Sequence, residues 1–227
     1  MTGHHLAFGH LSYDLAHLLG GAVLVLSFVL LYQRRLTAVI NSYALQAVAL
    51  AAAAAWQAWV QAAPHLYLTA VLALAAKGIA IPLAMHAIVR RLKVDRSLES
   101  ALGIFPSMAL GVGLVTLSIL VVLPVTPQAQ TLTREDLALA LSVVLMGLLM
   151  MITRRTALTQ VIGFMSLENG LILAAVSVAG MPLVVELSVA VLVLLAFAVF
   201  GVFFFRIRDR FDSLDIGHLD RIGGGHR

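Results

Sequence analysis

Long apolar runs separated by short polar connections make up most of this chain of 227 residues. Seven of the runs reach the length of about 20 residues that a helix needs to cross a bilayer. They lie at approximately 13–33, 38–61, 66–89, 101–123, 135–153, 157–179 and 182–205. The pattern predicts an all-α, polytopic protein of the lipid bilayer with about seven transmembrane helices.

Basic residues gather in every second connection between these runs. Arginines and lysines follow the first, third, fifth and seventh runs, whereas the connections near 64, 124–127 and 180–182 hold almost none. Cytoplasmic loops of membrane proteins preferentially retain Lys and Arg. The asymmetry therefore predicts an outside N-terminus and a cytoplasmic C-terminus.

The composition supports a membrane protein and excludes several kinds of site. The chain is 61% hydrophobic and 11% charged, whereas soluble domains carry about 25% charged residues. It has no cysteine, which excludes disulfides and thiolate metal sites, and it has no phosphate-binding loop, dinucleotide fingerprint or metal-spaced histidine pair. We expect no catalytic residue, metal or cofactor, and the net charge of +4 indicates membrane orientation rather than nucleic-acid binding.

Three ionisable residues, Lys77, Glu168 and Glu186, interrupt the apolar runs. A charge at the bilayer centre costs about 2.5–3.5 kcal/mol on insertion scales, and such residues commonly serve ion or proton pathways. Glu168 precedes the turn at 180–182 by a helical distance of about 18 Å, which places it near the midplane. A carboxyl at this depth is a candidate for proton exchange, and the alternative is a neutral acid that only joins two helices.

Lys77 is predicted to lie at nearly the same depth as Glu168. Pro82 follows it, and the missing N–H of a proline leaves the carbonyl of Gly78 without its helical partner. Lys77 is then either a proton-exchanging partner of Glu168 or half of a static ion pair. Glu186 lies about 10 Å from Glu168 along the membrane normal, as a lateral member of a relay or as a side chain that reaches the interface.

His17, His86 and Asn169 are possible accessory residues. Histidine can relay protons, although a lone histidine in a helix more often makes one packing hydrogen bond. Ser166 and Gly170 form a small-xxx-small pair, which predicts a helix-packing face.

Several motifs carry a family resemblance. They are Thr153-Arg154-Arg155, Ile162-Gly163-Phe164, Leu167-Glu168-Asn169-Gly170, Lys77 with Ile81-Pro82-Leu83, Val185-Glu186 and Ser213-Leu214-Asp215-Ile216. Together they resemble the hydrogenase-4 component E family, membrane subunits of formate-hydrogenlyase-type [NiFe] hydrogenases. The likeness covers most of the chain, but the first run and the region 95–130 match in hydropathy alone.

Over its last three spans that family is similar to the K-type subunit of complex I and to the C subunit of multisubunit Na⁺/H⁺ antiporters. Those subunits carry one glutamate in the second helix and one in the third, and the matching positions here are Glu168 and Glu186. The resemblance implies that both belong to a proton relay. It divides the chain into an external N-terminus over 1–12, four helices over 13–133, a three-helix relay unit over 134–206 and a cytoplasmic tail over 207–227.

The resemblance implies a non-redox membrane subunit of a proton-coupled oxidoreductase complex in a prokaryotic inner membrane. Its partners would be the other membrane subunits of a hydrogenase or complex I-like assembly and a cytoplasmic peripheral arm, with no nucleic acid. Two alternatives stay open: a subunit of a multisubunit cation/proton antiporter, and a purely structural spacer in a membrane arm.

Overall fold

The computed structural model describes residues 2–92, 102–125 and 131–178, and these residues form helices and short connections without a strand. The helices are α1 (Thr2–Tyr32), α2 (Leu36–Val60), α3 (His65–Leu72), the π-helix η1 (Ala73–Ala80), α4 (Ile81–Leu92), α5 (Ile104–Val125), α6 (Thr131–Thr153) and α7 (Ala157–Ser177). The predicted all-α class is confirmed for this part of the chain. The predicted seventh run with Glu186, and the tail over 207–227, lie outside the described residues.

Six helical segments in the described part are long and apolar enough to cross a membrane. They are Asp14–Tyr32, Leu36–Val60, His65–Arg90, Ile104–Pro124, Arg134–Thr153 and Ala157–Ser177. Each matches one of the first six predicted runs to within a few residues. The third segment is a single rod in which α3, η1 and α4 follow one another without a loop.

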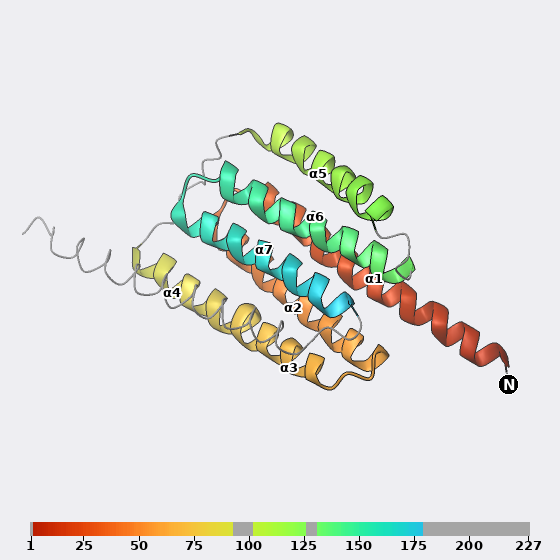
Figure 1. The fold of residues 1–227 in the computed structure, drawn as a ribbon. Helices are drawn as coiled ribbons and strands as arrows, with labels where there is room; N and C mark the ends of the chain where they lie inside the picture. The colour runs from red at the N-terminus through yellow and green to blue at the C-terminus, as the bar shows by residue number, and fades with distance from the viewer. Residues whose placement is uncertain (1, 93–101, 126–130, 179–227) are drawn as a thin grey trace, which may run out of the picture. The chain divides into compact units, whose positions relative to one another are not determined.

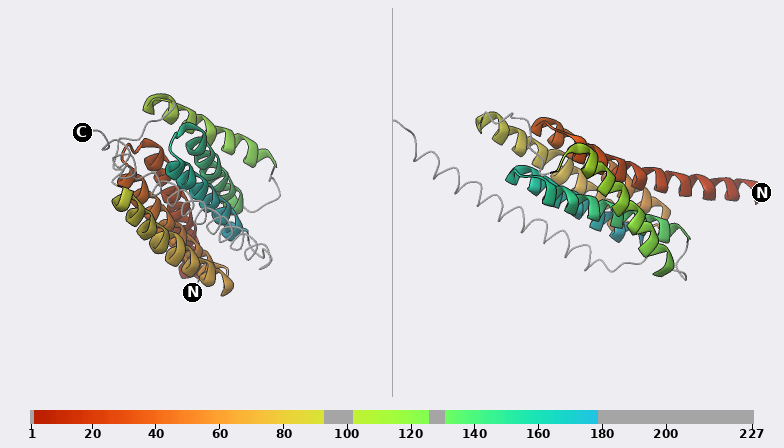
Figure 2. Two further views of the ribbon diagram at one scale, coloured as in Figure 1. Left: turned by 90° about the vertical axis from the view of Figure 1, so that its left-hand side faces the viewer. Right: turned by 90° about the horizontal axis from the view of Figure 1, so that it is seen from above.

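Helices α2 and α7 lie side by side, and every other helix except α5 packs against one of them (Figure 1). Helix α6 packs along α7, α1 contacts both α2 and α6, and the α3–η1–α4 rod covers α2. Helix α5 contacts only α6 and α1 to any extent among the described helices. The first turns of α1 extend beyond its neighbours (Figure 2), so the predicted external segment is helical from Thr2 onward.

Glycines bring α6 and α7 into backbone contact. A Cβ added to Gly147 would lie 2.5 Å from the backbone nitrogen of Leu167, and one added to Gly170 would lie 2.7 Å from that of Val144. Gly163 faces the same contact, because its added Cβ would meet the Gly147 carbonyl at 3.1 Å. Small residues permit this approach of two helices. The contact fixes which side of α7 remains for α2 and the π-helix.

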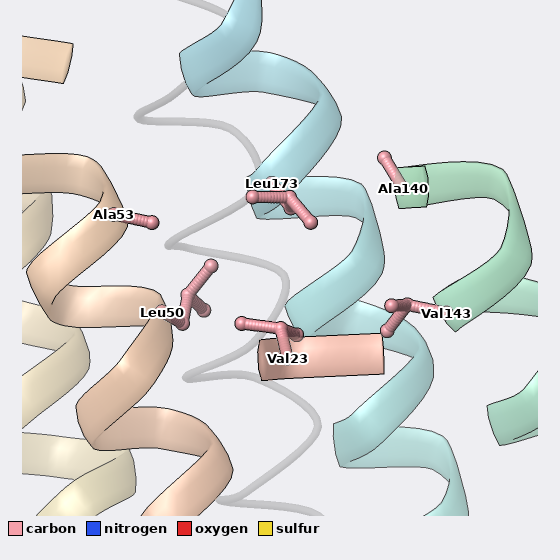
Figure 3. Close-up of a cluster of buried hydrophobic side chains, with 6 residues drawn as sticks. All are labelled: Val23, Leu50, Ala53, Ala140, Val143 and Leu173. Atoms are coloured by element: carbon pink, nitrogen blue, oxygen red, sulfur yellow. The ribbon is translucent and has the colours of Figure 1, made fainter. Parts of the chain in front are cut away.

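An apolar cluster fills the space between four of the helices (Figure 3). It comprises Val23 of α1, Leu50 and Ala53 of α2, Ala140 and Val143 of α6, and Leu173 of α7. We call these six residues the apolar layer. Each is at most 4% exposed, and polar clusters occupy the bundle on both sides of it.

Candidate functional site: a buried ion pair and its amide chain

Lys77 and Glu168 form a buried ion pair. The Lys77 Nζ atom of η1 lies 3.4 Å from Glu168 Oε2 of α7, and the two residues are 2% and 5% exposed. The geometry of this contact is that of an ion pair without a hydrogen bond, because Glu168 Oε2 has no hydrogen-bond partner among the described residues. The structure thus brings together the two charges whose depth the sequence predicted to be similar.

Asn169 connects the lysine to helix α2. Lys77 Nζ donates to Asn169 Oδ1 at 3.0 Å, and Asn169 Nδ2 donates to Gln46 Oε1 at 3.1 Å. An ammonium group can only donate, so it fixes the orientation of the Asn169 amide, and that amide in turn fixes Gln46. The proposed accessory residue Asn169 is therefore a direct neighbour of the ion pair.

Gln46 extends this series of hydrogen bonds to α1 and to Ser166 of α7. Its Nε2 lies 2.8 Å from Ser27 Oγ, 3.0 Å from Ser166 Oγ and 3.3 Å from the Val23 carbonyl oxygen. The two hydrogens of the amide nitrogen are shared among these three oxygens, and Ser27 Oγ itself donates to the Val23 carbonyl at 3.1 Å. Polar groups from α1, α2, η1 and α7 thus form one directed hydrogen-bond chain.

The Tyr43 hydroxyl is a second buried polar group without a hydrogen-bond partner among the described residues. Tyr43 lies one turn before Gln46 on α2 and is fully buried. Its hydroxyl lies within the electrostatic field of Glu168. Buried polar atoms usually have partners, since leaving one without costs about 1–3 kcal/mol. The Tyr43 hydroxyl is therefore an unsatisfied buried group, whereas Glu168 Oε2 keeps its ionic contact with Lys77.

The π-helix explains how the sequence places Lys77. The Ile81 N–H donates to the Ala76 carbonyl, five residues earlier, as in a π-turn. Pro82 has no N–H, so the next bond of this pattern, to the Lys77 carbonyl, cannot form and the chain returns to an α-helix. The sequence predicted an interruption here through the Gly78 carbonyl. The interruption is present, but as a wider helical turn that begins at Ala73.

Helix α7 divides its small and polar residues between two neighbours. Gly163 and Gly170 contact α6, whereas Ser166 and Asn169 hydrogen-bond to Gln46 of α2. The prediction that Ser166 and Gly170 share one packing face is correct for Gly170 only. Ser166 instead belongs to the polar chain.

The two histidines lie away from the ion pair. His86 Nδ1 contacts the Pro82 carbonyl at 2.8 Å, one turn earlier in its own helix. His17 lies between Glu135 and Asp136 near the start of α6. The structure therefore places neither of these possible accessory residues in direct contact with Lys77 or Glu168.

Arg154 joins the C-terminal ends of α6 and α1. Its guanidinium nitrogen donates to the carbonyls of Leu30, Leu31 and Gln33, at 3.2, 2.8 and 2.6 Å, and the residue is 3% exposed. These carbonyls end α1, where a cation is favourable. Burial lowers the pKa of Arg154 from its usual value, but an arginine keeps its charge at neutral pH. An arginine that the sequence presented as an orientation signal is thus also a structural clamp.

Sequence comparison relates this chain to an uncharacterized mycobacterial protein. No protein-family model and no solved structure matches the chain. An uncharacterized protein of Mycobacterium tuberculosis, Rv0085, is 30% identical over 202 residues, which cover 88% of this chain and 91% of that protein. The chain therefore belongs to the same family as the uncharacterized protein Rv0085 of Mycobacterium tuberculosis.

Proposed function

We propose that the chain is a proton-translocating membrane subunit of a group 4 [NiFe] hydrogenase or formate-hydrogenlyase-like complex. The observation that carries this proposal is the buried Lys77–Glu168 pair at 3.4 Å with its amide chain through Asn169 and Gln46. Glu168 is the proton-exchanging carboxyl and Lys77 is the cation that polarises it. Glu186 is their lateral neighbour in the relay.

A location in a membrane is supported by the six long apolar helices and by their outer surfaces, and the prokaryotic inner membrane is the part of the proposal that rests on the hydrogenase resemblance. Helix α5 exposes large apolar side chains, among them Leu110, Val112 and Leu120, the last of these 65% exposed. Soluble proteins rarely leave such continuous apolar surfaces open, whereas lipid covers them at no cost. In the orientation that the arginines favour, the Arg154 end faces the cytoplasm and the His17 end faces outward.

The ion pair suits proton transfer because it has a neutral counterpart. When one proton moves from Lys77 Nζ to Glu168 Oε2, an ammonium and a carboxylate become an amine and a carboxylic acid, with no change in net charge. Burial penalises the charged form and mutual attraction favours it, so the two forms can lie close in free energy. In this proposal the buried Tyr43 hydroxyl, which has no hydrogen-bond partner among the described residues, is the group through which the pair exchanges its proton.

The hydrogenase assignment rests on the Leu167–Gly170 and Thr153–Arg155 motifs. The other membrane subunits and the peripheral arm of such a complex would be the partners, since this chain has no cysteine to hold an iron–sulfur cluster. A multisubunit cation/proton antiporter would use the same buried residues. Purification of the tagged chain in mild detergent separates these cases, because a [NiFe] large subunit and iron–sulfur proteins accompany it only in a hydrogenase.

A static role is the main rival for the ion pair, and a neutral double variant tests it. Glu168→Gln alone leaves the Lys77 ammonium buried without its counter-charge, so a loss of activity could reflect misfolding. Lys77→Met combined with Glu168→Gln removes both charges and nearly preserves both side-chain volumes. We expect this double variant to assemble into the complex and to lose proton-coupled turnover. Normal turnover in an assembled double variant would contradict the relay and favour the spacer.

A further inference from the structure

A second cluster of ionisable groups lies at the end of the bundle where α2 and α7 end and α6 begins. His17 Nε2 lies 2.8 Å from Glu135 Oε2, and His17 Nδ1 lies 3.0 Å from Asp136 Oδ1. The side chains of Glu135, His17 and Asp136 are 50%, 29% and 6% exposed, in that order. The imidazole therefore joins a solvent-facing carboxylate to a buried one.

The two contacts of the imidazole define how many protons the cluster holds. A neutral imidazole has one N–H and can donate to one carboxylate only. The second nitrogen–oxygen contact requires another proton, either on the ring or on one of the carboxyls. We propose that His17, Glu135 and Asp136 form a proton-exchange site, in which a proton that arrives at Glu135 passes through the imidazole to Asp136.

The described parts of helices α2, α5 and α7, which surround the site, add only neutral side chains to it, so the proton belongs to His17, Glu135 and Asp136. Gln57 Nε2 donates to the other oxygen of Asp136 at 3.4 Å, and Gln61 Nε2 donates to Gln57 Oε1 at 3.1 Å. Helices α2 and α5 contribute no Asp, Glu, Lys, Arg or His to this end, and α7 contributes the neutral Ser177.

Two further charged residues lie near the site on its own helices. Arg134, which precedes Glu135, donates to the Leu123 carbonyl of α5. Asp14, one turn before His17 on α1, is exposed. Neither makes one of the two contacts of the imidazole, so the ring and its two carboxylates form the exchange site.

The apolar layer separates this site from the Lys77–Glu168 pair. Along α2, Gln57 and Gln46 belong to the two polar clusters and are about 16 Å apart, with Leu50 and Ala53 of the layer between them. On α7, Leu173 of the layer lies between Asn169 and Ser177 along the helix in the same way. Apolar side chains cannot pass a proton, so proton exchange across this layer requires water to enter it. If the proposed function holds, His17 and its carboxylates are the outward terminus of the relay, and hydration of the layer controls passage.

The proton count can be measured on the full-length chain without any partner. Histidine labelled with ¹⁵N in lipid nanodiscs reports which ring nitrogens carry a proton, and His17→Gln identifies the His17 signal among the eight histidines. Infrared spectroscopy in H₂O and D₂O reports a protonated carboxyl. At neutral pH we expect either a doubly protonated His17 or a carboxylic acid band that disappears in Asp136→Asn or Glu135→Gln. A singly protonated His17 with no such band would overturn the site.

The matched variants distinguish the site from general packing. The Glu135→Gln, Asp136→Asn double variant should leave His17 neutral with one N–H, whereas His86→Gln should leave the His17 signal unchanged. Retention of the extra proton in the double variant would show that it does not belong to this cluster.

The place of the site in the relay is tested separately in the assembled complex. Asp136→Asn should lower proton-coupled turnover by about a hundredfold or more, at the lower end of what a positioned acid–base group contributes. His86→Gln serves as the control with ordinary turnover. If the Lys77→Met, Glu168→Gln variant is inactive and Asp136→Asn is fully active, the site is not the terminus. If both are fully active, the proposed function fails, while the proton count still decides whether the site exists.

Discussion

Asn169 donates to Gln46 through facing amides, with Asn169 Nδ2 at 3.1 Å from Gln46 Oε1. The two residues come from α7 and α2, the helices at the centre of the described bundle. Because Asn169 also accepts from Lys77, this single amide contact transmits the orientation of the buried cation to α1 and α2. The polar chain is therefore a structural unit and not a set of separate pairs.

Gln46→Leu should destabilise the chain by about 1–3 kcal/mol, because it leaves the buried Asn169 Nδ2 without an acceptor. Ser27→Ala should cost less, since Gln46 Nε2 keeps Ser166 Oγ and the Val23 carbonyl as acceptors. Thermal unfolding of both purified variants in the same detergent measures the difference. Equal stability of the two would indicate that the Asn169–Gln46 bond contributes little.

Backbone contact between α6 and α7 predicts that an alanine destabilises the protein at Gly147 but not at Gly113. Gly147→Ala places a Cβ at 2.5 Å from a backbone nitrogen of α7, which cannot move as a flexible side chain would. The two helices must separate, at a cost of about 1–3 kcal/mol. Gly113→Ala in α5 meets nothing within 4 Å and should be neutral or stabilising by up to about 1 kcal/mol. Thermal unfolding tests this order, and a Gly147→Ala variant as stable as Gly113→Ala would contradict the contact.

The clamp at the end of α1 depends on the length of the arginine side chain. Arg154→Lys keeps the charge, but lysine is shorter, so its ammonium group falls short of the position from which one guanidinium nitrogen donates to the carbonyls of Leu30, Leu31 and Gln33. We expect a clear loss of stability, and Arg35→Lys, at an exposed position in the nearby connection, serves as the charge-matched control. Amide exchange in the last turn of α1 should increase in the Arg154 variant alone. Unchanged exchange there would indicate that the clamp is dispensable.

The natural absence of cysteine allows the orientation to be tested with single cysteines. Ala62, in the connection between α2 and α3, and Ala157, the first residue of α7, are exposed at opposite ends of the bundle. In intact cells, a membrane-impermeant maleimide should label Ala62→Cys from outside, and should label Ala157→Cys only after the membrane is opened. The reverse pattern would contradict the outside N-terminus that the arginine distribution predicts.

The sequence predicted most of the helices and the charged pair because both depend on local signals. Apolar runs of bilayer length mark the helices, and a charge inside such a run, as at Lys77 and Glu168, is conspicuous whatever its partner. Pro82 indicated an interrupted helix, although a π-turn cannot be distinguished in advance from a free carbonyl. Glu186 remains a prediction, since it lies outside the described residues.

The residues of the two polar clusters that the sequence did not predict carry no local signal of their contacts. Gln46 is neutral, and only its position inside an Ala- and Leu-rich run could have indicated a buried hydrogen bond. Glu135 and Asp136 begin an apolar run, where acidic residues are ordinary helix-end features. Their contact with His17 joins positions more than a hundred residues apart, and periodicity contains no information on such pairs. Arg154 indicated only the membrane orientation, so its contacts with the end of α1 were not predicted from the sequence.

Tyr43→Phe separates stability from function at the centre of the proposed relay. The Tyr43 hydroxyl has no hydrogen-bond partner among the described residues, so its removal should leave stability unchanged or raise it by about 1 kcal/mol. Proton-coupled turnover should nevertheless fall, because the proposed relay exchanges the proton of the ion pair through this hydroxyl. Tyr32→Phe, at an exposed position, controls for the general effect of losing a hydroxyl. Wild-type turnover in a stable Tyr43→Phe variant would remove Tyr43 from the relay, whereas a fall in both stability and turnover would indicate that the hydroxyl holds a structural water.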